Sequence, residues 1–306
     1  MNSQSSRQDV YKKYLNPTVV SRLSSMELRA KLVVEGFMAG LHKSPYHGFS
    51  VEFAEHRQYM PGDDLKHVDW KVYGKTDRYY VKQFEEETNL KAHILLDCSG
   101  SMAYGSGEVS KFQYASYLAS AIIYLLVKQR DAAGLVTFDE NIQRYLPPRS
   151  VATYLPVLLS ELENTETSKS TDIAATLHEI AERIKRRGLV LVFSDFFDQN
   201  IDGVIQGLKH FRHRNHEVLV FQVLDVMEST FAFKDDTIFE DLETQEKMST
   251  QPAQIRAEYR KLMQQFIRRI QKSCRENNID HVLLTTETPY DLALSQFLQK
   301  RKRVGG

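Results

Sequence analysis

The stretch HILLDCSGSM, residues 93–102, indicates the fold class of this chain. Its apolar beginning is typical of a short strand that is buried on both faces of a sheet, and that strand ends at Asp97. Further apolar runs follow at AAGLVTF (132–138), GLVLVFSD (188–195), HEVLVFQVLD (216–225) and HVLLTT (281–286). Strands that alternate with helical patterns predict an α/β fold, with a doubly wound and mostly parallel sheet of the Rossmann type.

The segments between these strands carry helical patterns, with two exceptions. We expect helices at residues 112–128, 154–162, 171–187, 201–211, 253–276 and 290–299, because apolar residues recur there at helical spacing. IQRYLP (142–147) is expected to pair antiparallel with the second strand, and residues 228–251 predict a polar β-hairpin insertion. The stretch QKRKRVGG (299–306) predicts a solvated tail, with a weak contact to anionic lipid or nucleic acid as the alternative.

Residues 1–90 form a region of different character from the α/β domain at 91–306. Residues 19–42 have the periodicity of one helix, and the segment that follows is rich in Pro, Gly, His and Asp, which predicts turns and short extended pieces. RYYVKQFEEE (78–87) alternates as an edge strand does. The sequence therefore predicts an N-terminal helical and β region that precedes the sheet.

Composition excludes several classes of protein. Lys plus Arg and Asp plus Glu number 40 each, so no bulk charge favours nucleic acid as a partner. Two cysteines predict a reducing compartment rather than a disulfide framework. The longest uncharged run, Phe112–Val127, is shorter than the roughly 20 residues that span a bilayer. We expect a soluble, cytoplasmic protein without a transmembrane segment, in which a peripheral membrane contact is left open.

Carboxylates and hydroxyls gather where the predicted strands end. Asp97, Ser99 and Ser101 alternate after the first strand, so their side chains would face one point, and Asp195 ends another strand. Carboxyl ends of parallel strands share one sheet edge, and oxygen ligands suit Mg²⁺ or Mn²⁺. The alternative is a polar strand end, with Thr171 or Ser170 as the N-cap of the next helix. Cys98 is expected to point away from the ion as a buried, inert thiol.

ILLDCSGSM (94–102), KSTDIAATL (169–177) and LVLVFSDF (189–196) resemble the metal-ion-dependent adhesion site of von Willebrand factor A domains. The resemblance implies a fold of that type and a Mg²⁺ or Mn²⁺ site. The ligands that it implies are Asp97, Ser99, Ser101, Thr171 and Asp195. One departure is Phe196, which stands where that family usually has Gly.

The N-terminal region narrows the resemblance. Its pattern is Arg57-x-Tyr59-x-x-Gly62-Asp63, then Asp69-Trp70-Lys71, then Glu85-Glu86-Glu87. This pattern resembles bacterial proteins of unknown function that carry a von Willebrand A-like domain and are often encoded beside MoxR-type AAA+ ATPases. The resemblance implies such an ATPase and a client protein as partners. Candidate contact residues are Arg57, Asp63, Asp69, Trp70 and Lys71, although Trp70 could equally fix the N-terminal region to the domain.

The expected function is a non-catalytic, cation-dependent protein-binding module with a chaperone-like role beside the ATPase. The alternative is a metal-dependent phosphoester hydrolase. That class needs a second carboxylate at position 99, where this chain has Ser. The G-x-S-x-G and Walker A motifs are also missing from the sequence, so we expect neither a serine hydrolase nor a nucleotide-binding enzyme. HFRHRNH (210–216) could suggest zinc, but a basic helix end is the simpler interpretation.

Overall fold

The computed structural model describes residues 13–41, 56–58, 73–74, 79–82, 90–168, 172–233, 237–240 and 247–305. The predictions for Asp63, Asp69, Trp70, Lys71 and Thr171 lie outside these described residues. Arg57 belongs to the short strand β1 (His56–Gln58), which pairs antiparallel with β2 (Tyr80–Lys82). Of the edge strand predicted at 78–87, the described residues 80–82 are a strand and pair with residues 56–58.

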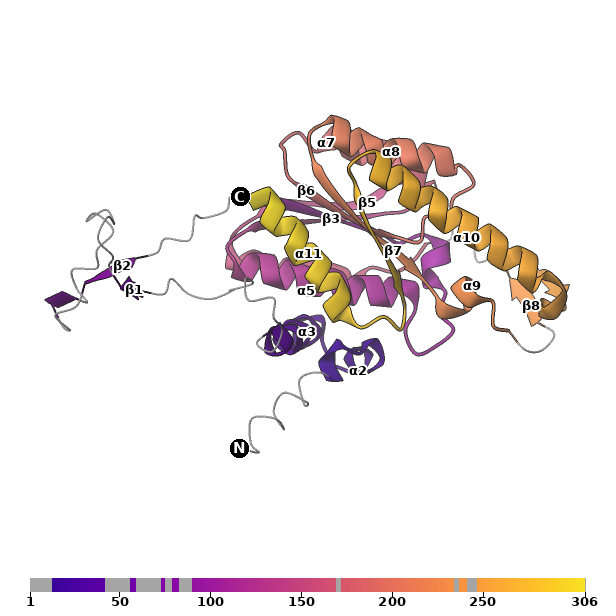
Figure 1. Cartoon of the computed structure of the whole chain (residues 1–306), viewed down its shortest axis with the longest axis horizontal. Coiled ribbons are helices and arrows are strands. Elements are labelled where there is room, and N and C mark those ends of the chain that lie inside the picture. The colour runs from indigo at the N-terminus through magenta and orange to yellow at the C-terminus, as the bar shows by residue number, and fades with distance from the viewer. Residues whose placement is uncertain are drawn as a thin grey trace.

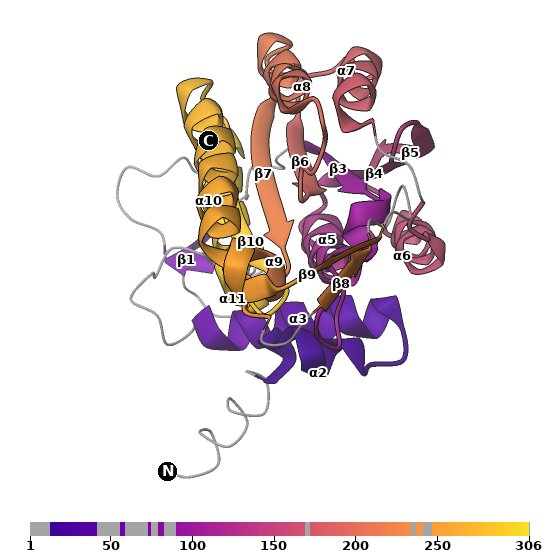
Figure 2. The ribbon, with the colours of Figure 1, turned by 90° about the vertical axis from the view of Figure 1, so that its right-hand side faces the viewer.

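A six-stranded sheet forms the centre of the molecule (Figure 2). Its order is β10 (Asp280–Thr285), β7 (Glu217–Leu224), β6 (Leu189–Ser194), β3 (Lys91–Asp97), β4 (Ala132–Phe138) and β5 (Ile142–Arg149). Every neighbouring pair is parallel except β4 with β5, which is antiparallel. The predicted α/β class and mostly parallel Rossmann-like sheet are confirmed, including the antiparallel strand at its edge.

Helices cover both faces of this sheet (Figure 1). One layer holds α3 (Met26–Leu41), α5 (Lys111–Lys128), α6 (Leu155–Asn164) and α11 (Tyr290–Gly305). The other holds α7 (Ile173–Arg183), α8 (Ile201–His213) and α10 (Pro252–Glu276). Each face of the sheet packs against one helix layer and forms its own hydrophobic core. Side chains alternate between the two cores along β3, so that Ile94 and Leu96 lie in the first and Leu95 lies in the second. The sheet is therefore doubly wound.

Helix α5 is the central helix of the first layer. Its N-terminus has a capping box in which Ser110 accepts from Gln113 N and Gln113 accepts from Ser110 N. Tyr114 stacks on Tyr290 of α11 with ring centroids 4.9 Å apart, and the Tyr114 hydroxyl donates to Thr288 O at 2.8 Å. These contacts fix α5 and α11 together.

The edge strand β5 contains Pro147 and Pro148, which fits a strand with one unpaired side. Its pairing with β4 shifts register between Ala133 and Leu135. A Cβ at Gly134, which lies between them, would come within 2.6 Å of Pro148 N. The close approach of the two backbones at this irregularity therefore requires glycine.

Two predicted helix starts are wrong. The single helix expected at 19–42 is divided into α2 (Pro17–Ser21) and α3, and Ser25 Oγ accepts from Leu28 N at 3.2 Å in the first turn of α3. The helix expected from Thr171 begins instead at Ile173. Its N-cap is Asp172, whose side chain accepts from Ala175 N at 3.1 Å, rather than Thr171 or Ser170. In each case the helix begins after a residue whose side-chain oxygen accepts a hydrogen bond from a backbone N–H of the first turn.

The predicted solvated tail is wrong for its helical part, because α11 continues to Gly305. Lys300 is only 7% exposed, and its ammonium lies 2.7 Å from Glu217 and 2.8 Å from Asp280. The stripe expected on α10 comprises Ile255, Tyr259, Leu262, Met263, Phe266, Ile267 and Ile270. It is only partly buried: Leu262 is 55% exposed while Met263 and Ile270 are buried.

The predicted insertion is a short helix followed by a hairpin. Helix α9 (Val226–Thr230) leads to the antiparallel pair β8 (Thr237–Glu240) and β9 (Lys247–Thr250). The remaining short elements are η1 (Lys13–Leu15), η3 (Gly100–Ala103) and η4 (Ala152–Tyr154). Within the described residues, no helix combines the length and apolar character that crossing a membrane requires.

Candidate metal site

The two predicted carboxylate ligands lie at the same edge of the sheet. Asp97 is the last residue of β3, and Asp195 directly follows β6, the parallel neighbour of β3. Both side chains are fully buried. The fold therefore brings together two acidic groups that are far apart in the sequence, as the strand pattern predicted.

Asp97 is held by one donor on each carboxylate oxygen. Ser194 Oγ donates to Oδ2 at 2.5 Å, and Ser99 N donates to Oδ1 at 2.8 Å. Ser194 Oγ in turn accepts from Phe196 N at 2.8 Å, so the ends of β3 and β6 are joined through this hydroxyl. A carboxylate has about four lone-pair positions, so Asp97 keeps acceptor capacity for a further ligand.

The two predicted serine ligands also come together. Ser99 Oγ and Ser101 Oγ are 3.3 Å apart, with Ser99 fully buried and Ser101 partly exposed. The chain turns into η3 at Gly100, directly between them. The Ser99 side chain hydrogen-bonds to Asp97, and Ser101 contacts Ser99. Because Ser101 already belongs to η3, the turn at Gly100 brings the two hydroxyls together, rather than alternation along an extended chain.

The negative charge at this edge is costly in the protein interior. Burial first, and the charge of Asp195 second, raise the pKa of Asp97 to about 7, although hydrogen bonds from Ser194 and Ser99 lower it. A group with that pKa is about half protonated at neutral pH, and a bound cation would displace the proton. The site therefore favours either a proton or a positive ion beside Asp97.

Lys111 is a charged residue of the site that the sequence did not predict. Its side chain is fully buried at the first turn of α5, and Nζ lies 2.7 Å from Asp195 Oδ2 and 2.6 Å from Glu228 Oε1. Burial lowers the pKa of Lys111, but the attraction of Asp195 and Glu228 outweighs burial and raises it. The ring of Phe197 lies 4.7 Å from Nζ. Lys111 is therefore a charged counter-ion for both acids.

Glu228 connects this ion pair to α9. It accepts from the backbone N of Asp225 at 2.9 Å, as the second half of a capping box. Burial raises the pKa of Glu228 to about 7, even though Lys111 lowers it. Two signals could have indicated these residues: a Lys directly before a long uncharged run, and an acid three residues after Asp225.

Three carboxyls lie at this edge: Asp97 and Asp195, which are fully buried, and Glu228, whose side chain is 16% exposed. Within the described part of the chain, the one ammonium that pairs with any of them is that of Lys111, which contacts Asp195 and Glu228. If all were ionised, the cluster would carry two negative charges in excess. Such an excess is unfavourable in a low-dielectric interior. A divalent cation is the species whose charge matches it.

Thr171 lies outside the described residues, but the described chain on both sides of it is anchored to the site. Ser168 N donates to Cys98 O at 2.7 Å, directly after Asp97. Ile173 N donates to Asp198 Oδ2 at 2.9 Å, shortly after Asp195. The segment that contains Thr171 therefore begins and ends beside the two acidic loops.

Two further residues at this edge have structural roles. Asp225 is buried and accepts from Ser106 Oγ at 2.6 Å, Ser106 N at 3.0 Å and Thr286 Oγ1 at 3.1 Å. Its carboxylate is therefore engaged by the loops around it. Cys98 is buried and its thiol donates to Phe138 O at 3.1 Å, and burial raises its pKa. The prediction of an inert thiol agrees with this environment.

The donor chemistry fits a hard cation. Carboxylate and hydroxyl oxygens are the ligands that Mg²⁺ and Mn²⁺ prefer. Within the described part of the chain, no group of three or more His, Cys, Asp and Glu side chains could hold a metal ion by itself. The predicted set differs from such a group, since Ser99, Ser101 and Thr171 supply hydroxyls. Lys111 already engages one oxygen of Asp195, and Phe197 N donates to the other at 2.9 Å.

Similar proteins are bacterial and carry little functional description. An uncharacterized protein of Mycobacterium tuberculosis and one of Mycobacterium bovis are each 25% identical over 234 residues, which is 75% of this chain and 72% of theirs. A conserved hypothetical protein, BatB from Bacteroides thetaiotaomicron, superposes with a TM-score of 0.48 at 17% identity, covering 70% of this chain and 99% of its own.

An aerotolerance-related membrane protein from Bacteroides fragilis gives a TM-score of 0.47 at 18% identity, over 69% of this chain and 99% of its own. The model of a family described as protein of unknown function DUF58 matches residues 55–267, which is more than half of the chain. The chain therefore belongs to the DUF58 family.

Proposed function

We propose that this chain is a non-catalytic protein-binding module of von Willebrand A type, which holds a divalent cation and accepts a carboxylate from a partner. One observation carries the proposal: Asp97 and Asp195 are buried beside the nearly buried Glu228, and among the described residues Lys111 is the one cation that pairs with any of these acids. The proposed ligands are Asp97, Ser99, Ser101, Thr171 and Asp195, with Mg²⁺ or Mn²⁺ as the ion. The sheet edge at which they lie is where parallel α/β sheets commonly bind ligands.

Each residue has a distinct part in this proposal. Asp97 supplies charge, and the Ser194 hydroxyl orients it. Ser99 and Ser101 supply neutral oxygens, which leave the ion with positive charge for an incoming carboxylate. Lys111 holds Asp195 in place and limits the charge that this acid gives to the ion. A bound divalent ion would supply Lewis acidity, and the chain's own groups fix its position.

The partner that we propose is a MoxR-type AAA+ ATPase, with which the chain would act on a client protein in a chaperone-like role. This part rests on the resemblance of the N-terminal pattern and of the metal-site motif. A bridging ion predicts that the complex needs both the ion and Asp97. The test is capture of the purified ATPase by this chain, with Mg²⁺ and with EDTA.

We expect Asp97→Asn to lower capture at least about tenfold, as EDTA does, because the lost charge weakens metal binding. The matched control is Asp139→Asn, which changes another buried aspartate at the end of β4 that bonds locally to Gln143 and Asn141. Capture that survives both EDTA and Asp97→Asn would exclude a metal bridge. Phosphoester turnover that Asp97→Asn abolishes would favour the hydrolase instead.

The affinity for Mg²⁺ should rise with pH. Because the pKa of Asp97 is raised to about 7, its ionised fraction grows from about 0.1 at pH 6 to about 0.9 at pH 8. We therefore expect Mg²⁺ to bind roughly tenfold more tightly at pH 8 than at pH 6, as measured by calorimetry. The free energy of unfolding without metal should change in the opposite direction with pH. The raised pKa of Asp97 stabilises the fold at low pH, and this contribution is lost as pH rises through about 7.

The pKa is raised for both Asp97 and Glu228, and the Glu228→Gln variant shows which of the two causes the pH dependence. It should keep the pH dependence of Mg²⁺ binding, because Glu228 faces Lys111 and is not among the proposed ligands. A pH-independent affinity in the unchanged protein would contradict the role of Asp97.

A further inference from the structure

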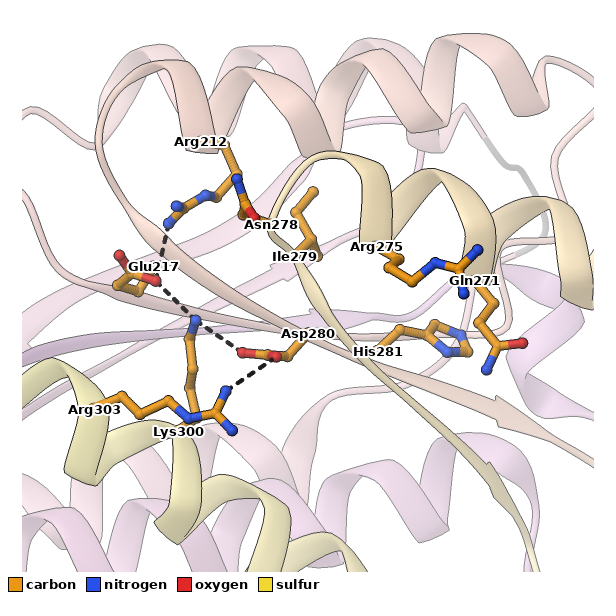
Figure 3. Close-up of a pocket in the computed structure, with 10 residues that line it drawn as sticks. All are labelled: Arg212, Glu217, Gln271, Arg275, Asn278, Ile279, Asp280, His281, Lys300 and Arg303. Atoms are coloured by element: carbon orange, nitrogen blue, oxygen red, sulfur yellow. Dashed lines mark hydrogen bonds and ion pairs between the residues drawn. The ribbon is translucent and has the colours of Figure 1, made fainter.

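A second candidate site lies at the opposite edge of the sheet from Asp97 and Asp195. A pocket of about 580 Å³ lies where β7 and β10 begin, at Glu217 and Asp280, and where helices α8, α10 and α11 end (Figure 3). Its size is within the range of about 300–1,000 Å³ that small-molecule sites occupy. The length of β7 separates it from the proposed metal edge, so the two sites are independent.

One end of this pocket is an ion-pair network (Figure 3). The Lys300 ammonium bridges Glu217 and Asp280, and Arg212 Nη1 lies 2.9 Å from Glu217. Burial raises the pKa of Glu217, but hydrogen bonds from Lys300 and Arg212 outweigh burial and lower it. Both carboxylates of the pocket are therefore already neutralised by cations of the chain, whereas Arg303 reaches Asp280 only at 3.7 Å.

The lining side chains have a surplus of positive charge. Arg212, Arg275, Lys300 and Arg303 oppose only Glu217 and Asp280, in a chain whose formal net charge is zero. The ends of α8, α10 and α11 favour cations through their helix dipoles, which explains basic residues there but not their convergence on one pocket. Among the described residues, the Arg275 side chain has no hydrogen bond or ion pair, so its guanidinium is available to a ligand.

The other end of the pocket combines the Arg275 guanidinium with uncharged polar groups. Arg275 and Gln271 of α10 and His281 of β10 lie together there (Figure 3). Burial lowers the pKa of His281 to about 4, so the ring is neutral at physiological pH, and it bonds through Nε2 to Gln222 at 3.0 Å. Neutral groups beside a free arginine suit a ligand that combines an anionic group with hydrogen-bonding groups.

We propose that this pocket binds a small phosphate-bearing molecule, with Arg275 as its phosphate ligand. A guanidinium presents a planar fork of donors that matches phosphate oxygens, and pairs of this kind are stronger than neutral hydrogen bonds. Arg303 lies at the far end of the pocket, beside Asp280, and adds to the positive charge of the lining. Lys300 stays in the ion-pair network with Glu217 and Asp280.

The test is titration of the full chain by calorimetry with inorganic pyrophosphate, without divalent ions and at about 150 mM salt, where long-range attraction is screened. We expect saturable binding at one site, weakened about tenfold by Arg275→Gln, the factor that loss of one charged phosphate contact gives. The matched control is Lys272→Gln, which removes the same charge from the exposed face of α10 outside the pocket. This variant should bind as the unchanged protein does.

Three results would overturn the proposal. One is no binding at about 10 mM pyrophosphate, the weakest affinity that a specific site would show. Another is equal weakening by Arg275→Gln and Lys272→Gln, which would indicate general attraction to a basic surface. The third is citrate binding as tightly as pyrophosphate, which would exclude a phosphate preference. Pyrophosphate binding should persist in Asp97→Asn, so the fate of the proposed metal site does not affect this outcome.

Discussion

Replacing Lys111 by Met should lower the free energy of unfolding by about 3–5 kcal/mol, the cost of removing one partner from a buried ion pair. Lys111 is fully buried, and its ammonium holds Asp195 at 2.7 Å and Glu228 at 2.6 Å. Methionine preserves most of the volume but leaves two acids without their counter-ion. Urea unfolding at neutral pH, in the absence of divalent ions, measures the difference.

The control for this variant is Lys128→Met, at the other end of the same helix. Lys128 is exposed, so we expect a change of no more than about 0.5 kcal/mol. Added Mg²⁺ should stabilise Lys111→Met more than the unchanged protein, because an ion would take over charge that the ammonium had neutralised. Equal destabilisation by the two variants would show that the buried charge of Lys111 does not stabilise the fold.

Phe196 predicts an unusual order of stabilities. It is fully buried in the second core and has φ of 61°, in the left-handed region that favours glycine. Phe196→Ala should cost about 3–5 kcal/mol through lost burial. Phe196→Gly should cost about 1 kcal/mol less than Phe196→Ala, because glycine has no Cβ to strain this backbone conformation.

Phe193 provides the matched comparison, since it is an equally buried phenylalanine within β6. There the order should reverse, with Phe193→Gly about 0.5–1 kcal/mol less stable than Phe193→Ala, because glycine weakens a strand. Thermal or urea unfolding of the four variants decides the question. The same order at both positions would mean that backbone conformation at Phe196 does not limit stability. The von Willebrand A domains that this sequence resembles usually have Gly at this position. The positive φ at Phe196 is a physical reason for glycine there.

The sheet was predictable because its signals are local. Each inner strand is a short apolar run bounded by polar residues. β3 ends on the predicted acid Asp97, and β6 is followed directly by the predicted acid Asp195. Ser99 and Ser101 are close in the sequence to Asp97, and the turn at Gly100 brings their two hydroxyls together. Local chemistry therefore predicted most of the candidate site.

What the sequence did not predict depends on partners that are distant in the chain. Lys111 is 84 residues from Asp195 and 117 from Glu228, so no local pattern indicates that it is buried between them. Lys300 is 83 residues from Glu217, which is why a basic stretch resembled a free tail. The start of α7 shows a different limit, because Ser170, Thr171 and Asp172 are all suitable caps and the structure selects Asp172.

The contact between α5 and α11 bears on the order in which the molecule assembles during synthesis. Tyr114 and the carbonyl of Thr288 that its hydroxyl contacts are 174 residues apart, and Tyr290 is fully buried against the same ring. The ribosome synthesises α5 well before α11, the helix that packs against it. During that interval the apolar flank around Tyr114 is open to water and to other nascent chains, a state in which chaperones commonly intervene. This core is therefore completed only after α11 has been synthesised.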